Sequence, residues 1–286
     1  MQVKTRQRGF MLQTALVTKA AQLPALSTSV TELTSICVDE NWRIEDACTV
    51  IDSDPLLLGV LIREANSAAF GASSMVETSR DAVVRLGASR IMAVAIEMGL
   101  ERLLGAVRAY GAAALTTFKH CYHTAVAAET IKAATRVRLP HAFAATALLH
   151  DVGEIILSHH LDVTAGPSLQ EIRQSRLGEV EAERGELDLD HCEVSALMCR
   201  QWRMPQAIVQ GVQHHHSPWA LNDPLSYAVS LADQVATCTE TPQYSSIASD
   251  SLLVGRCLSE LGLSQADMTS LIDDTNRRLD ERGRTR

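Results

Sequence analysis

The chain has 286 residues, a hydrophobic share of 46%, an aromatic share of 4% and a formal net charge of −8. Such a hydrophobic share is ample for a sizeable core, whereas the negative charge argues against indiscriminate binding to phosphate backbones, which relies on Lys and Arg. No stretch reaches the roughly 18 uninterrupted apolar residues of a membrane span, and the basic N-terminus lacks the apolar segment of a signal peptide. We therefore expect a cytoplasmic protein that contacts neither nucleic acid nor membrane.

The composition favours helices over strands. Ala, Leu and Val dominate the hydrophobic residues, and Ala and Leu are strong helix formers, whereas strands draw on β-branched and aromatic residues. The seven cysteines form no CxxC pair, and several lie inside apolar helical patterns. We predict an all-α fold whose cysteines are reduced core residues.

The first part of the chain is predicted to be a helical subdomain over residues 23–105, preceded by an N-terminal segment, 1–22. Amphipathic spacing predicts helices over residues 27–37 and 44–51. Asp54 is a good N-cap and Pro55 suits the first helical position, so another helix is expected from there to about residue 66. Two more helices, 79–86 and 89–104, are predicted on either side of Gly87.

The second part is predicted to be another helical subdomain over residues 106–240, with the boundary suggested by Gly105 and Gly111. A long helix to about residue 136 is followed by one buried helix through AFAATALLHDVGEIIL, to about residue 160. A polar stretch over residues 166–188 is predicted to be an exposed helix and connection. Further helices are predicted over residues 191–202, 205–214 and 224–237. Residues 241–286 are predicted to be a helical extension that ends in a frayed or disordered charged tail, RRLDERGRTR.

The dipeptide His150-Asp151 lies inside that otherwise apolar run. Burying an imidazole and a carboxylate there costs on the order of several kcal/mol unless something compensates them. A bound metal ion is the obvious compensator, and the plainer alternative is an aspartate that only caps a helix end. The dipeptide therefore directs attention to other potential metal ligands.

Further histidines and an aspartate occur on or next to other predicted helices. A two-metal site takes about six or more imidazole and carboxylate groups, and helices from distant parts of a chain supply them when their inner faces meet. We predict a site for one or two divalent transition-metal ions, of the Fe, Mn, Ni, Co or Zn type. Its candidate ligands are His123, His150, Asp151, His191, His215, His216 and Asp233.

Each candidate also has a plainer interpretation when it is considered alone. His123 fits an ordinary core or surface histidine, and His120, one turn earlier, is a competing ligand of lower rank. His191 fits the first turn of a helix, and the run 214–216 fits a helix C-terminus, where cationic histidines favour the dipole. Asp233 falls near a polar stripe that fits a solvated face. The order and joint occurrence of these residues favour the metal site.

Several segments of the chain resemble those of a known family. The segments LPALSTSVTELT, VIDSDPLLLGVLIREANSAAFG and DAVVRLGASRIMAVAIEMGL are similar to an HDOD domain, the output module of many bacterial signalling proteins. The segments HTAVAAE, ATALLHDVGEIIL, DHCEVSALMCRQWRMP, VQHHHSPW and LSYAVSLADQVA resemble the HD-superfamily portion of the same module. The resemblance runs from about Leu23 to Thr237. It implies two packed helical subdomains, of which the second is similar to HD and HD-GYP phosphohydrolases.

In those enzymes the ligands follow the order His, His-Asp, His, His-His, Asp, which falls by motif on the same seven residues of this chain. The Ser-Pro after the histidine triplet favours His215 and His216, with His214 as the alternative. Two departures lower the expectation of cyclic-dinucleotide hydrolysis. Glu154, an exposed glutamate or an outer-shell partner, stands where HD-GYP enzymes have a lysine, and SPWALNDPLS replaces their Gly-Tyr-Pro motif.

Two functions follow from these observations. The first is a noncatalytic signalling module that binds a signalling protein or a small phosphorylated ligand and holds its metal for structural reasons. The second is a metal-dependent phosphohydrolase, a phosphodiesterase or nucleotide phosphatase, with Asp151 as its catalytic residue. Asp151 would then bridge two metals, and a water acidified between them would attack phosphorus. In that hypothesis His191 and the paired histidines hold one ion, and the other is held by His123, His150, Asp151 and Asp233.

Overall fold

A computed structural model of the protein describes residues 18, 25–67, 75–106, 111–164, 168–173, 179–241 and 251–283. Within these ranges the chain forms helices and no strand, which confirms the all-α prediction. The helices are α2 (Thr28–Val38), α3 (Ile44–Ser53), α4 (Pro55–Ala65), α5 (Ser79–Ala106), α6 (Gly111–Ala134), α7 (Phe143–Leu149), α8 (Gly153–Thr164), α9 (Leu169–Arg173), α10 (Glu179–Leu187), α11 (His191–Gln201), α12 (Gln206–Gln213), the 3-10 turn η3 (Pro218–Ala220), α13 (Pro224–Glu240), α15 (Leu252–Glu260) and α16 (Gln265–Gly283).

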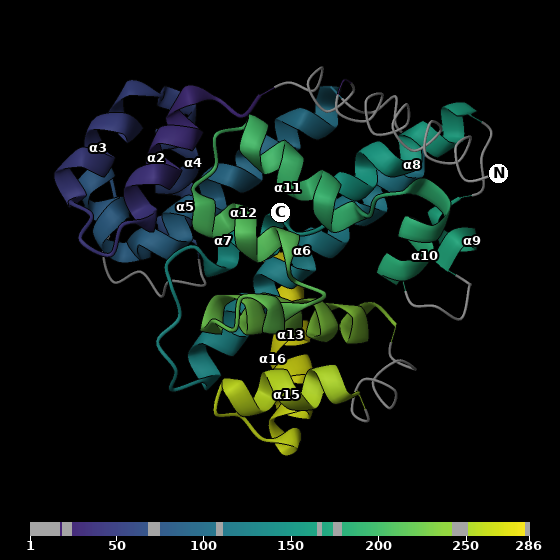
Figure 1. The fold of residues 1–286 in the computed structure, drawn as a ribbon. Coiled ribbons are helices and arrows are strands. Elements are labelled where there is room, and N and C mark those ends of the chain that lie inside the picture. Colours follow the sequence, from purple (N-terminus) through teal and green to yellow (C-terminus); the bar gives the residue numbers. More distant parts are fainter. Residues whose placement is uncertain are drawn as a thin grey trace.

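The helices gather around α6, which is central in the molecule (Figure 1). Helices α2 to α5 lie together at one side, and α8 to α10 lie at the other, with α11 and α12 between them. Helices α13, α15 and α16 form the lower end of the view. Helix α6 packs against α7, α8, α13 and α16, and α11 packs against both α8 and α12. One hydrophobic cluster joins residues from Leu26 to Val212, so the two predicted subdomains share a core.

The start of α4 agrees with the predicted cap. The Asp54 carboxylate accepts hydrogen bonds from the amides of Leu56 and Leu57, both at 3.1 Å, and Pro55 occupies the first turn. The same carboxylate accepts a hydrogen bond from the Ser29 hydroxyl of α2. The cap therefore ties two helices together as well as starting one.

Removing this cap is expected to lower stability. Asp54→Ala should reduce the free energy of unfolding by about 1 kcal/mol, the usual value for a lost N-cap. The hydrogen bond from Ser29, with those from Leu57 and Leu56, lowers the pKa of Asp54 below its ordinary value of 3.8. Because the folded-state pKa is the lower one, the contribution is present above the unfolded-state pKa and disappears as the pH falls through the folded-state pKa.

Urea unfolding at neutral and acidic pH measures this contribution. Asp52→Ala, at an exposed position two residues earlier, is the matched control and should stay within about 0.5 kcal/mol of wild type. A loss of equal size in both variants, or a loss that persists in acid, would contradict the capping role of Asp54.

Helix α5 is broken where the sequence predicts it. Gly87 has φ +70° and ψ 167°, a backbone conformation that suits glycine and interrupts the helical run. The two predicted helices are therefore the two arms of α5, joined at this residue.

The prediction of one buried helix through His150-Asp151 is wrong. Helix α7 ends at Leu149 and α8 begins at Gly153, so the dipeptide lies in a turn between two helices. In a helix, neighbouring side chains point about 100° apart. The turn removes that constraint and lets both side chains face one site.

The prediction of a frayed tail is wrong for residues 277–283, which complete α16. Arg282 donates to Glu129 of α6 at 2.6 Å, and Arg90 of α5 also pairs with Glu129, at 2.9 Å. The tail is helical because its charges have partners across the helix packing. Three predicted parts lie outside the described residues: the end of the tail at 284–286, the N-terminal segment 1–22 apart from Thr18, and residues 107–110 at the predicted domain boundary. The division into domains therefore stays a prediction.

The cysteines agree with the sequence analysis. All seven are free, and six of them are buried.

Across the described ranges, no helix combines the length and the apolar character that crossing a bilayer demands.

Candidate metal centre

Side chains from five places in the chain converge beside the turn between α7 and α8. They come from the middle of α6, the turn itself, the start of α11, the segment after α12 and the middle of α13. Three of the histidines, His150, His191 and His215, are at most 1% exposed, and Asp151 is 7% exposed. The polar groups are thus withdrawn from water, and their contacts with one another decide their energy.

Asp151 is the centre of this arrangement. Its Oδ2 atom lies 3.2 Å from His150 Nε2 and 3.7 Å from His120 Nε2. Its Oδ1 atom lies 3.3 Å from His215 Nε2 and 3.4 Å from His191 Nε2. Each carboxylate oxygen therefore faces a different pair of histidines.

Three of these imidazoles are held from behind by their other ring nitrogen. His150 Nδ1 donates to the Ala147 carbonyl at 2.8 Å, and His215 Nδ1 donates to the Val212 carbonyl at 2.7 Å. His191 Nδ1 lies 2.7 Å from the buried Glu183 carboxylate. Metal-binding histidines are usually oriented in this way, with Nδ1 bonded to a carbonyl or carboxylate and Nε2 left for the metal.

The buried atoms at the centre lack hydrogen-bond partners of their own. His150 Nε2, His215 Nε2 and Asp151 Oδ1 are all buried and accept or donate no hydrogen bond. When Nδ1 carries the proton, the Nε2 atom of a neutral imidazole presents a lone pair to the negatively charged carboxylate oxygen. The two electron-rich atoms repel each other, and a cation between them would be bound by both. The residues present therefore fit a divalent transition metal, which takes imidazole and carboxylate ligands.

The shifted pKa values of the buried groups also indicate that the centre attracts positive charge. Burial opposes protonation of His191 and His215, but the Cys192 thiolate and the Asp151 carboxylate outweigh it and hold both pKa values well above 6.5. Burial also opposes ionisation of Asp151, yet His150 and His191 hold its pKa well below 3.8. In the absence of metal, protons thus supply part of the charge that the centre attracts.

Asp233 of α13 completes the side of the centre next to α6. Its Oδ1 atom lies 3.1 Å from His120 Nε2 and 3.8 Å from His150 Nε2. Its Oδ2 atom accepts a hydrogen bond from Gln234 at 3.1 Å. Because Asp233 is 7% exposed, the solvated polar face that the sequence left open does not describe it.

His120, which the sequence ranks below His123, lies closer to these carboxylates. His120 contacts Asp233 through Nε2 and Glu240 through Nδ1, the latter at 3.1 Å. His123, one turn later, has its Nδ1 atom 3.1 Å from the other oxygen of Glu240. Both histidines share Glu240, but the described contacts join only His120 to Asp151 and Asp233.

A pair of alanine variants separates the two histidines. His120→Ala is expected to lower metal affinity by more than about tenfold, because it removes an imidazole that faces both carboxylates. His123→Ala should lower the affinity less, since its ring faces Glu240. Metal competition titrations with a chelator measure both. The reverse order would assign the ligand role to His123, as the family resemblance implies.

The second group of potential ligands lies on the other side of Asp151. One ligand atom from each of His191, Cys192, His215 and His216 lies within 4.8 Å of the others. The rings of His215 and His216 are 4.3 Å apart, and His216 Nε2 lies 3.9 Å from Glu179. His214 is the C-cap of α12, so the described group contains the last two histidines of the triplet.

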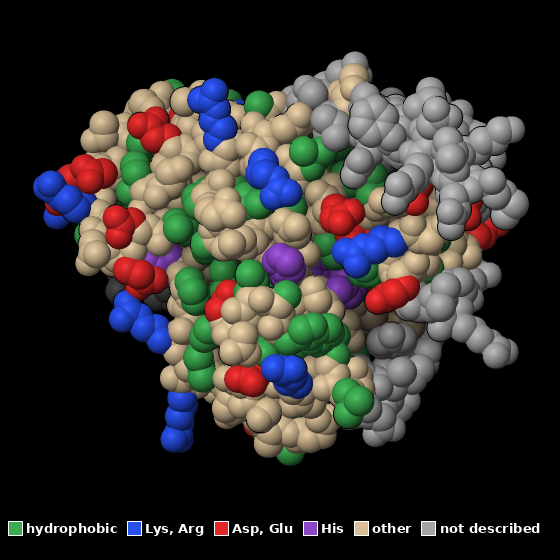
Figure 2. Space-filling view, viewed as in Figure 1, with side chains coloured by type: hydrophobic (Ala, Val, Ile, Leu, Met, Phe, Trp, Pro, Cys, Tyr) green, Lys and Arg blue, Asp and Glu red, His purple; other side chains and the backbone are tan. Residues whose placement is uncertain are grey.

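The centre reaches the surface at one edge. The side chains of His120, His123 and His216 are 16%, 15% and 23% exposed, whereas those of His150 and His215 are 0% exposed. Figure 2 shows histidine side chains at the surface near the middle of the face, with hydrophobic and acidic side chains around them. The edge of the cluster at His120, His123 and His216 is therefore partly exposed to solvent.

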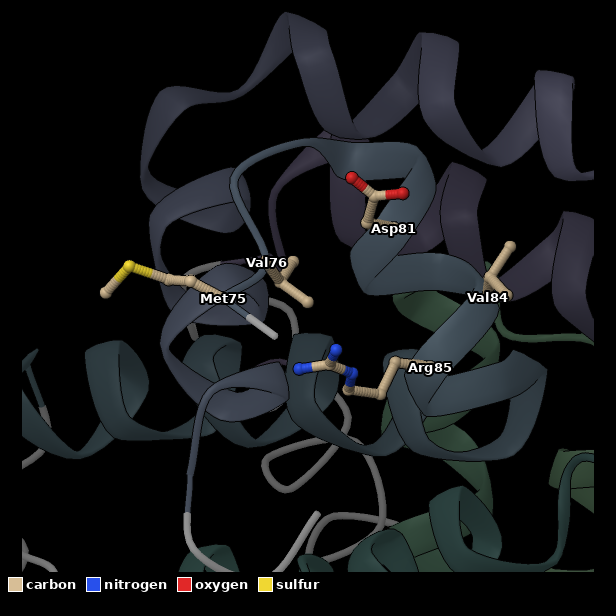
Figure 3. Close-up of a pocket in the computed structure, with 5 residues that line it drawn as sticks. All are labelled: Met75, Val76, Asp81, Val84 and Arg85. Atoms are coloured by element: carbon tan, nitrogen blue, oxygen red, sulfur yellow. The ribbon is translucent and has the colours of Figure 1, made fainter. Parts of the chain in front are cut away.

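A separate surface pocket lies in the first part of the chain. It is lined by Met75, Val76, Asp81, Val84 and Arg85 (Figure 3). Arg85 donates to the backbone carbonyl of Ala65 at 3.2 Å, so its guanidinium is engaged in packing α5 against α4. The pocket includes no residue of the histidine cluster and does not extend the metal centre.

Three neighbours of the centre were not found by sequence reasoning. Glu183 lies in the stretch predicted to be exposed, yet it is 0% exposed and also accepts from the His191 amide at 2.9 Å. Glu240 lies at the end of α13, and Cys192 directly follows His191. The position of Cys192 next to a candidate ligand was the only available signal, because no spacing pattern marks the two glutamates.

Several known proteins are similar to this chain in sequence or in fold. A family model of the HDOD domain matches residues 23–218. A solved structure from Shewanella amazonensis SB2B, provisionally described as a phosphohydrolase, is 21% identical, with a TM-score of 0.66 and coverage of 93% of this chain and 95% of that one. Another from Marinobacter aquaeolei VT8, provisionally described as a signal transduction protein, is 18% identical, with a TM-score of 0.69 and coverage of 96% and 64%.

An uncharacterized protein from Treponema pallidum (strain Nichols) is 23% identical over an alignment of 217 residues, with coverage of 72% of this chain. The chain spans 40% of the length of that curated relative. The two solved structures show a shared helical fold, and the family model shows the family. Because that model covers well over half of the residues, the chain belongs to the HDOD domain family.

Proposed function

We propose that this protein is a regulatory module that holds divalent transition metal at the histidine and aspartate cluster and acts by binding. The observation that carries the proposal is the position of Asp151, whose two oxygens face four Nε2 atoms at 3.2 to 3.7 Å. The anchored Nδ1 atoms and the unpartnered buried Nε2 atoms support it further. The metal would replace the protons that otherwise balance the buried carboxylates.

The charge near the cluster favours binding over turnover of a phosphoester. Glu154 and Glu183 each offer a carboxylate oxygen within 4.8 Å of a His191 ring nitrogen, and Glu154 accepts from the Thr117 hydroxyl at 3.1 Å. A carboxylate at position 154 repels a phosphate where the lysine of the related hydrolases would attract it. We infer that a protein partner, or a ligand whose phosphate reaches only the metal, is the molecule recognised.

Phosphoester hydrolysis is the second candidate function. It is favoured by the two groups of potential ligands, because the two oxygens of Asp151 face histidines of both groups, as a two-metal hydrolase requires. The partly exposed edge at His216 favours it as well. When bound, two metals would acidify a water and neutralise charge on phosphoryl oxygens. Asp151 would hold the ions at a fixed separation, and the histidines behind it would exclude bulk water.

Elemental analysis of anaerobically purified protein, followed by a phosphoester panel, tests both functions. We expect near-stoichiometric transition metal in the wild type and no turnover with Mn, Fe, Co or Ni restored. Turnover that Asp151→Ala removes would establish the hydrolase instead. Glu154→Lys is the informative companion, because turnover that appears only in this variant would identify the missing cation as the reason for inactivity. Protein that holds no metal even after reconstitution would overturn the metal centre itself.

A further inference from the structure

One potential ligand in the cluster has no counterpart in the His and Asp pattern. Cys192 is the second residue of α11 and is 3% exposed. Its Sγ atom lies 3.4 Å from His191 Nε2, the ring nitrogen that also faces Asp151. The sulfur is thus directed toward the centre of the cluster and away from the solvent.

The side chains around this sulfur form a nearly complete donor set. His191, His215 and His216 each place a ring nitrogen within 4.8 Å of it and of one another. His215 Nε2 is buried and has no hydrogen-bond partner, and its ring is held by the Val212 carbonyl. Four groups that can bind metal therefore surround one point, and one of them is a buried polar atom that nothing else satisfies.

We propose that the Cys192 thiolate is a ligand of this second metal position, together with His191, His215 and His216, and that the position selects zinc. The inference rests on the proposed metal centre and specifies one half of it. Thiolate is a soft ligand, and zinc is bound by four-coordinate sets of cysteine and histidine. The other position, around His120 and Asp233, offers only imidazole and carboxylate and suits harder ions such as manganese or iron.

Charge supports the division into two positions. With an ion bound at the second position the three imidazoles would be neutral, so the thiolate and the nearby Oδ1 of Asp151 would together balance its two positive charges. A bound thiol is deprotonated by the metal itself, so the proton leaves when the ion enters. Zinc binding at this position should therefore release more protons than binding to imidazoles alone.

Cobalt substitution tests the proposal directly on the full chain. Metal-free protein titrated with Co²⁺ should develop an intense sulfur-to-cobalt charge-transfer band in the near ultraviolet, as well as the weaker ligand-field bands of a tetrahedral ion. Cys192→Ser should lose the charge-transfer band and bind zinc at least about tenfold more weakly. Cys199→Ser, at a fully buried cysteine of the same helix outside the group, is the matched control and should keep both properties.

The wild-type spectrum is decisive even if Cys192→Ser does not fold. In that case, retention of the band in Cys199→Ser and in Cys121→Ser, a buried cysteine of α6, excludes these two sulfurs. Among the described residues, Cys192 is the one cysteine that belongs to a group of potential metal ligands, so the band is then assigned to it. A wild-type protein that binds cobalt without a sulfur band would overturn the Cys192 inference and leave the proposed function intact. A protein that binds no metal at all would overturn both.

Discussion

Asp151→Ala is expected to abolish tight metal binding. Removal of this carboxylate takes away the one group that faces both sets of histidines, at 3.2 Å from His150 and 3.3 Å from His215. Changes behind a metal ligand already lower affinity by about 10 to 100-fold, so loss of the shared ligand should exceed that range. Metal content by elemental analysis and affinity by chelator competition measure the loss.

The same substitution should also destabilise the metal-free protein. His191 and His215 have raised pKa values partly because of Asp151, and without it their protonated forms lose a buried counter-charge. Breaking such a buried pair costs about 3 to 5 kcal/mol. Asp46→Ala, at an exposed carboxylate of α3, is the control and should change neither metal content nor stability. Wild-type metal content in Asp151→Ala would refute the central role of this residue.

Gly153→Ala is expected to disrupt the centre from outside it. A Cβ atom at this position would lie 2.5 Å from the Ser195 amide nitrogen and 2.7 Å from the His191 carbonyl oxygen. Both are backbone atoms of α11, so the new methyl group cannot be accommodated by a side-chain rotation. The start of α11 must move away from α8, and His191 moves with it.

The expected loss of stability is about 1 to 3 kcal/mol, the usual range for an overpacked core, and metal affinity should fall as well. Gly185→Ala is the matched control, because a Cβ atom there meets nothing within 4 Å. That variant should gain up to about 1 kcal/mol from its higher helix propensity. Thermal unfolding with and without metal separates the loss of stability from the loss of metal affinity. A Gly153→Ala protein that is as stable and as metal-rich as wild type would show that the close approach of α8 to α11 is not required.

Local sequence signals predicted the helices well where the signal acts within a few residues. The cap at Asp54, Pro55 in the first turn and the break at Gly87 are each determined by one residue's own backbone preference and hydrogen-bonding groups. The two wrong predictions about the helices, at His150-Asp151 and in the C-terminal tail, concern longer-range effects. An apolar run cannot reveal that α7 stops at Leu149, and a charged tail looks disordered until Glu129 provides Arg282 with a partner.

The candidate ligands illustrate the same distinction. Residue type and order were enough to single out His150, Asp151 and the histidines after α12, because buried imidazole and carboxylate groups are rare without compensation. The choice between His120 and His123 depends on which of two positions one turn apart faces Asp233, and that follows from the rotation of α6 against α13. Sequence periodicity does not fix such a rotation when small and polar residues surround both positions.

By itself the sequence determined that the chain is helical, where most helices start, and which residue types are available to bind metal. These properties depend on backbone preferences and on the cost of burying polar groups, and both act locally. Only the tertiary structure decided that Asp151 faces four imidazoles, that Glu183 is buried behind His191 and that Cys192 joins the second group. The contacts of Asp151 with His120, His191 and His215 join residues tens of positions apart. Their geometry is set by how α6, α8, α11 and α13 pack against one another.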